Sequence, residues 1–163
     1  MMRKLKTLIA LALVVMLTSC ASTNSEDGFM SVGNVSNTDC QRETRADTKS
    51  DPMLRLIMQG SNINGELINY PVNCSHGDLG VSCKIEGSKF EIKMTDTAQD
   101  KEREIITKCI CRINVYFTVY DVEGEFFHMI VNGIDITDVS FKESSIVEIN
   151  LRTKECHTTP EDD

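Results

Sequence analysis

The chain has 163 residues, of which 40% are hydrophobic and only 6% aromatic, with 17 Lys and Arg against 25 Asp and Glu. This length is enough for one domain with a modest hydrophobic core. A net charge of −8 repels nucleic acid and anionic lipid headgroups, which excludes a nucleic-acid-binding role. Because the chain has no Trp, its composition gives no sign of an aromatic platform for sugars.

Residues 1–19 are predicted to be a removable signal peptide. Arg3, Lys4 and Lys6 give a positively charged start, and an apolar run follows over residues 8–17. This run is too short to cross a bilayer core of roughly 30 Å as a helix. A charged start, a short apolar stretch and small residues before a cleavage site are typical of an export signal. We therefore expect the mature chain to begin outside the cytoplasm.

The end of this leader, Leu17-Thr18-Ser19-Cys20, resembles the lipobox of bacterial lipoprotein signals. The resemblance implies that Cys20 carries a diacylglycerol on its sulfur, a covalent lipid that anchors the chain to a membrane, and no other cofactor is expected. Ala21 follows the anchor where Asp would retain it, and by the same resemblance this implies transfer to the outer membrane, on either face. The alternative is a plain secretory signal in which Cys20 stands by chance.

The mature chain divides into three parts by composition. Residues 20–52 are rich in Ser, Thr, Asn and Asp, and we expect a flexible linker that begins at the lipidated Cys20. Residues 53–156 alternate apolar and polar side chains with a period of two, which predicts half-buried strands and a β domain. Residues 157–163 form a short acidic tail.

Short strands are predicted throughout this domain. A polar loop at 60–65 joins the first two, and Gly87-Ser88 is the turn of a hairpin. Asn132-Gly133 is a second turn, of the tight type that tolerates positive φ. The charged stretch 96–104 lacks an apolar face and is predicted to be a loop with at most a short helix. The expected strands are 53–59, 66–72, 81–85, 90–94, 109–120, 126–131 (central in its sheet, since both faces are apolar), 134–136 and 146–151.

This number and spacing of strands predicts an all-β fold, an antiparallel β-sandwich of immunoglobulin-like or similar type. The longest strand, 109–120, has one apolar face made by its odd-numbered residues, because successive side chains of a strand point to opposite faces. Cys109 and Cys111 lie on that face two residues apart and point the same way, so they are poor partners for each other.

Seven Cys are many for this length, and six remain when Cys20 is lipidated. An even number in an exported chain favours disulfides, with 15 possible pairings, whereas Cys-x-Cys lacks the spacing of common zinc sites. We expect separate partners for Cys109 and Cys111, with Cys83 the first candidate and Cys74 the next. A bond between Cys40 and Cys156 could join the two ends. No metal site is predicted, and the disulfide candidates are Cys40, Cys74, Cys83, Cys109, Cys111 and Cys156.

The run 108–119, Lys-Cys-Ile-Cys-Arg-Ile-Asn-Val-Tyr-Phe-Thr-Val, resembles a recurring element of small exported lipoproteins of the Bacteroidetes. Cys74 and the segment Val131-Asn132-Gly133 fit the same layout, so the resemblance covers roughly residues 53–151. It implies an envelope address and a β-sandwich and assigns no activity. In that group Asp-Thr-small accepts O-linked sugars, and Asp96-Thr97-Ala98 therefore makes Thr97 a candidate glycosylation site.

Catalytic residues do not stand out. His128 lies within an apolar strand, and His76 could activate Ser75 or bind a metal, although the turn chemistry of the Gly77-Asp78 pair explains its loop equally well. We therefore expect a non-enzymatic binding module at the outer membrane, whose partner is an envelope protein, a surface glycan or a host factor. The alternatives are an exported protease inhibitor with a bait loop at 96–106, and a metal-binding or hydrolytic envelope protein that uses His76.

Overall fold

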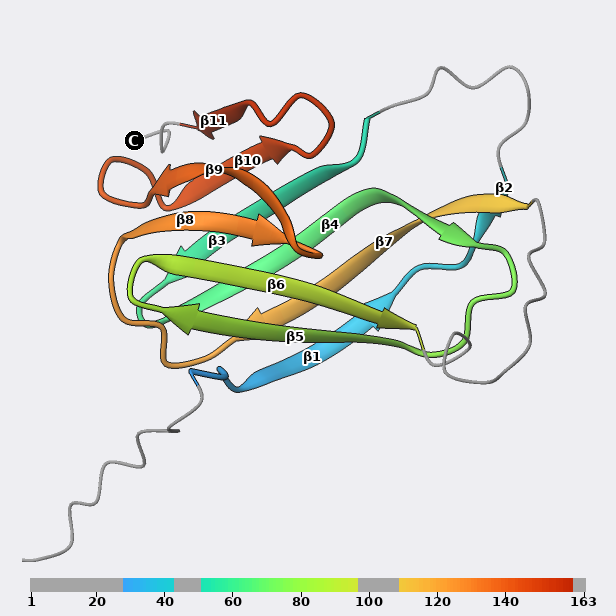
Figure 1. Ribbon diagram of the computed structural model, residues 1–163, viewed down its shortest axis with the longest axis horizontal. Helices are drawn as coiled ribbons and strands as arrows, with labels where there is room; N and C mark the ends of the chain where they lie inside the picture. Colours follow the sequence, from blue (N-terminus) through green and yellow to red (C-terminus); the bar gives the residue numbers. More distant parts are fainter. Residues whose placement is uncertain (1–27, 43–50, 97–108, 160–163) are drawn as a thin grey trace, which may run out of the picture.

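The structure is a computed structural model that describes residues 28–42, 51–96 and 109–159 (Figure 1). Within these ranges the chain is all-β, which confirms the predicted fold class. In this part of the chain, no helix has the length and hydropathy needed to span a bilayer. Cys20, Thr97 and nearly all of the predicted 96–106 loop lie outside the described residues.

Eleven strands make up the described part of the chain. In order they are β1 Val32–Asn37, β2 Gln41–Arg42, β3 Met53–Gln59, β4 Asn62–Asn73, β5 Leu79–Glu86, β6 Lys89–Asp96, β7 Ile110–Val119, β8 Phe126–Val131, β9 Ile134–Ser140, β10 Ile146–Asn150 and β11 Cys156–Thr159.

The strands form two sheets that pack face to face as a β-sandwich (Figure 1). The first sheet has seven strands in the order β1-β7-β4-β3-β10-β11, with β2 also paired to β7. The second has four strands in the order β5-β6-β8-β9. All pairs are antiparallel except β6 and β8, which run parallel. The long strand β7 therefore lies inside the larger sheet, with β4 on one side and the two N-terminal strands on the other.

One hydrophobic core lies between the sheets. It follows from the alternation of the strands, because one face of each strand is apolar and turns away from water. Phe90 of β6 and Phe127 of β8 meet edge to face with ring centroids 5.6 Å apart, a favourable geometry for aromatic pairs. The largest fully buried side chains are Phe90, Phe127, Leu54, Leu56, Ile63, Leu67, Ile92, Ile113, Met129, Ile149, Val115 and Val119.

Both predicted turns are confirmed. Gly87 has a φ of 60° at the tip of the β5–β6 hairpin, and Asn132 and Gly133 have φ of 50° and 74° between β8 and β9. The prediction of a long polar loop at 60–65 is wrong. Strand β4 already begins at Asn62, and the turn is reduced to Gly60 and Ser61 because Ile63 enters the core with no exposed surface.

The predicted flexible linker is wrong over residues 28–42, which belong to the sandwich. Phe29 bridges Lys84 of β5, and the amide of Met30 donates to the carbonyl of Cys83 at 2.9 Å. The chain then crosses to the other sheet, where β1 and β2 pair with β7. This segment covers β5 in one sheet and β7 in the other, and without it both would be edge strands. An unpaired edge strand leaves its backbone donors and acceptors unsatisfied, so the pairing is favourable. Likewise β11 extends to Thr159, so the predicted tail at 157–163 begins within a strand.

Candidate functional site

A hollow of about 220 Å³ opens on the outer face of the seven-stranded sheet. Its lining comes from four neighbouring strands, β1, β3, β4 and β7. Most of the lining residues alternate with the core residues of these strands and face outward, whereas Gly65 and Phe117 belong to the inward-facing set. The lining residues are Asn34, Arg55, Ile57, Asn64, Gly65, Glu66, Tyr116, Phe117 and Thr118.

The register of the strands assembles one side of this hollow as a row of charged and aromatic side chains. Tyr116 of β7 lies opposite Glu66 of β4, and Glu66 lies opposite Arg55 of β3. Arg55 in turn lies opposite Glu148 of β10. Directly opposed residues in antiparallel strands have Cβ atoms roughly 5 Å apart. Four residues that are far apart in the sequence are thus brought into one line across the sheet.

Arg55 is the centre of this row. Its Nε donates to Glu148 Oε1 at 2.6 Å and its NH1 donates to Glu66 Oε2 at 3.2 Å. The hydrogen bond to Glu148 is the main cause that raises the pKa of Arg55. Because both carboxylates are held by the same guanidinium, the three side chains form a fixed polar wall with unused acceptor capacity on the carboxylate oxygens.

The other side of the hollow is a chain of neutral polar groups. Asn34 Nδ2 donates to Tyr120 Oη at 2.9 Å and lies 3.4 Å from Thr118 Oγ1. The Thr118 hydroxyl donates to Asn64 Oδ1 at 3.0 Å, and Asn64 Nδ2 donates to Gln59 at 3.0 Å. Such a network orients amide and hydroxyl groups before any ligand arrives, which lowers the entropy cost of binding.

Beneath the hollow, on the core side of the sheet, Phe117 packs against a glycine. A Cβ atom on Gly65 would lie 2.1 Å from Cζ of Phe117, so only glycine lets that ring pack against β4. Tyr116, the preceding residue of β7, points to the outer face and keeps 39% of its surface exposed. The hollow therefore combines the apolar side chain of Ile57, one accessible aromatic ring and two polar walls.

These lining residues offer hydrogen bonds and apolar contacts to a ligand. The described residues that line the hollow include no Ser, Cys, His or Lys, and their one carboxylate, Glu66, is paired with Arg55. This site was not predicted from the sequence. Alternation indicates which residues face outward, but the pairing of strands β3, β4 and β7 decides which of them meet.

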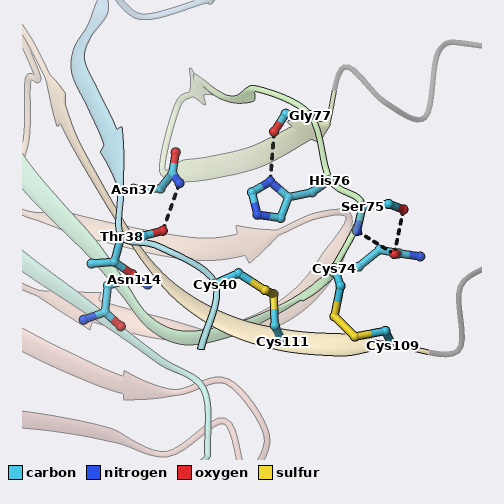
Figure 2. The surroundings of a disulfide bond; sticks show 11 residues. Asn37, Thr38, Cys40, Cys74, Ser75, His76, Gly77, Cys109, Cys111 and Asn114 are labelled. Atoms are coloured by element: carbon cyan, nitrogen blue, oxygen red, sulfur yellow. Dashed lines mark hydrogen bonds between the residues drawn. A yellow bond between two sulfur atoms is a disulfide. The ribbon is translucent and has the colours of Figure 1, made fainter. Parts of the chain in front are cut away.

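Two disulfides lie side by side at the start of β7 (Figure 2). Cys111 bonds Cys40, beside β2, and Cys109 bonds Cys74, just after β4. Separate partners for Cys109 and Cys111 were predicted, and this is confirmed, as is the candidacy of Cys74. Strand β7 is thereby fixed to its neighbours on both sides.

The other two disulfide candidates form no disulfide in the structure. Cys83 is 1% exposed in the core of the smaller sheet, and burial raises its pKa to about 12. Cys156 in β11 is half-buried, and burial also raises its pKa. Two predictions are therefore wrong: that Cys83 is a disulfide partner in the core, and that Cys156 pairs with Cys40. The segment 28–42, which was predicted to be linker, pairs with β7 and brings Cys40 to Cys111.

Two of the three histidines, His76 and His128, have hydrogen-bond partners in the described part of the chain. The Nδ1 of His76 is 2.9 Å from the carbonyl oxygen of Gly77, and the Ser75 hydroxyl donates to Asn73 Oδ1 at 2.9 Å (Figure 2). The hypothesis that His76 activates Ser75 gains no support from these contacts.

His128 lies on the outer face of the smaller sheet between two carboxylates. Its Nδ1 is 2.7 Å from Asp138 Oδ1 and its Nε2 is 2.9 Å from Asp135 Oδ2. The hydrogen bond to Asp138 and then that to Asp135 raise the pKa of His128. A ring whose two nitrogens both face carboxylates favours the protonated form, which is a poor general base.

Comparison with protein-family models, with curated proteins and with solved structures finds no significant match to this chain. The function must therefore be inferred from the geometry of the sites.

Proposed function

We propose that this protein is an outer-membrane lipoprotein whose β-sandwich binds a glycan in the hollow on the outer face of the seven-stranded sheet. The observation that carries the proposal is the composition of the hollow. Sugar rings present hydroxyl groups at their edges and C–H groups on their faces, and the hollow offers polar walls together with the apolar side chain of Ile57 and the ring of Tyr116.

The size of the hollow favours one sugar ring of a longer chain. Pockets for drug-sized ligands are ~300–1,000 Å³, and this one has a volume of about 220 Å³. An opening on a sheet face leaves room for the rest of a polysaccharide to extend past the rim. Tyr116 is the exposed aromatic side chain among the described lining residues and is therefore the ring that stacks on the sugar.

The export and anchoring part of the proposal is supported by the leader and the cysteines. The lipobox-like segment ending at Cys20 would fix the chain to the membrane, and residues 21–27 would separate lipid and sandwich. Two disulfides suit an oxidising compartment outside the cytoplasm.

Binding of the full-length protein to an array of bacterial envelope and host-surface glycans tests the proposal. We expect Tyr116→Ala to weaken binding of the selected glycan about tenfold, which is about 1.4 kcal/mol. Phe126→Ala is the matched control, because Phe126 is 55% exposed but lies in β8 of the other sheet. Equal losses in both variants, or no glycan binding at all, would count against the glycan.

A photo-crosslinking residue in place of Tyr116 identifies, in intact cells, which class of molecule binds at the hollow. It thus tests the glycan independently of the claim that the hollow is a binding site. Crosslinks to polysaccharide support the proposal as stated. Crosslinks to one envelope protein would keep the binding module and replace the glycan with a protein partner. No crosslink from this position would remove the hollow as the binding site.

A further inference from the structure

We propose that the two disulfides form a thiol–disulfide exchange site, in which an incoming thiol opens Cys74–Cys109 and the freed Cys74 then opens Cys40–Cys111. The sulfur atoms of Cys40, Cys74 and Cys111 all lie within 4.8 Å of one another. This separation is little more than two sulfur–sulfur bond lengths, each about 2.05 Å. The Cys74 sulfur is thus close to both atoms of the disulfide to which it does not belong (Figure 2).

Burial decides where the exchange begins. Cys74 and Cys109 are both half-buried, whereas Cys111 has no exposed surface. A small thiol from solvent therefore reaches the Cys74–Cys109 bond more readily than the Cys111 sulfur, and its attack on the half-buried Cys40 would leave a thiolate on the buried Cys111. The incoming thiolate attacks Cys109 Sγ, a mixed disulfide forms at Cys109, and the electron pair of the broken bond leaves on Cys74 as a thiolate.

Burial also decides the direction of the second step. When the Cys74 thiolate attacks Cys111 Sγ, a Cys74–Cys111 bond forms and the electron pair leaves on Cys40, which is half-buried and can be solvated and protonated by water. Attack on Cys40 would instead leave the charge on Cys111 in a fully buried position, where a thiolate is disfavoured. The expected product therefore has a Cys74–Cys111 bond and a free Cys40 thiol.

The new bond requires the Cα atoms of Cys74 and Cys111 to lie within about 7 Å. Cys74 lies beyond the end of β4, in a turn at residues 74 and 75, and the new bond requires a shift of this turn, in which the amide of Cys74 donates to the carbonyl of Cys109 at 3.1 Å. Release of Cys40 removes the covalent bond between β7 and the segment that leads into β2. The partner implied by this chemistry is a thiol or dithiol, and the exchange consumes one thiolate and returns one.

Two single substitutions in the full-length protein give a matched test. Cys109→Ser leaves the Cys74 thiol beside the second disulfide, and Cys74→Ser leaves the Cys109 thiol, which does not belong to the group of sulfurs within 4.8 Å. After alkylation and non-reducing digestion, peptide mass mapping of Cys109→Ser is expected to show a Cys74–Cys111 crosslink with Cys40 alkylated. In Cys74→Ser the Cys40–Cys111 bond should persist.

A kinetic measurement covers the case in which one variant folds poorly. With glutathione as the added thiol, the Cys40–Cys111 bond of the unmodified protein should open faster than that of a Cys74→Ala/Cys109→Ala variant with an unchanged circular dichroism spectrum. Equal rates, or a Cys109→Ser map that shows only Cys40–Cys111, would overturn the proposal. A Cys40–Cys74 crosslink in place of Cys74–Cys111 would overturn the predicted direction.

Discussion

Removal of the Cys40–Cys111 disulfide should cost a large share of the stability of this domain. The bond closes a loop with a sequence separation of 71, for which the chain-entropy relation gives about 4.4 kcal/mol at 25 °C. The second disulfide, between Cys74 and Cys109, lies within that loop. It shortens the path from Cys40 to Cys111 to about 36 residues, and the expected loss falls to about 3.8 kcal/mol. Small domains have only about 5–15 kcal/mol in total.

Urea unfolding of the Cys40→Ala/Cys111→Ala variant, followed by circular dichroism, measures this loss. The m-value should rise slightly, because an unfolded chain without this bond is more expanded. Cys156→Ala is the control, since it removes a thiol that forms no disulfide in the structure and should change the free energy of unfolding by no more than about 1 kcal/mol. A loss below about 1 kcal/mol in the double variant would refute the entropic reasoning.

Three further predictions concern the core, a surface histidine and a thiol. Gly65→Ala places a Cβ 2.1 Å from the Phe117 ring and should lower the free energy of unfolding by about 1–3 kcal/mol, with partial recovery when Phe117→Leu is added; an unchanged urea midpoint would contradict this. The pKa of His128 is raised in the folded state. The stabilisation that protonated His128 gives to the fold is therefore complete below the pKa of an unfolded His, ~6.5, and is lost as pH rises through the higher folded-state pKa. The difference in urea midpoint between the unmodified protein and His128→Gln should shrink from pH 6 to pH 9, and a constant difference would argue against the two carboxylate contacts. Cys83, 1% exposed with a pKa raised to about 12, should react with an aromatic disulfide reagent only after unfolding, whereas fast reaction of the native protein would show that the core opens.

Alternation of apolar and polar residues was sufficient to predict most strands and the β-sandwich. The hairpin around Gly87 and the turn at Asn132 and Gly133 were predictable because few residue types accept their positive φ. Residues 28–42 were mistaken for a linker because their polar composition hides a strand at the edge of a sheet. Edge strands bury little, and β1 has four exposed residues out of six.

Contacts between distant strands could not be predicted from the sequence. The hollow exists because Arg55, Glu66 and Tyr116 fall into one row of the β3–β4–β7 register, and a shift of one residue would send each side chain to the opposite face. The disulfides show the same limit. The shared face of Cys109 and Cys111 excluded a bond between them, but the choice of Cys40 for Cys111 depended on where the N-terminal segment pairs.

Mass spectrometry of the mature protein from bacterial membranes, with and without reduction, tests the central claim most directly. The claim is that an oxidised β-sandwich is tethered outside the cytoplasm. We predict an N-terminal peptide that begins at Cys20 with a lipid attached, Cys40–Cys111 and Cys74–Cys109 crosslinks, and unbonded thiols at Cys83 and Cys156. A water-soluble protein with an unmodified N-terminus and six free thiols would contradict the account.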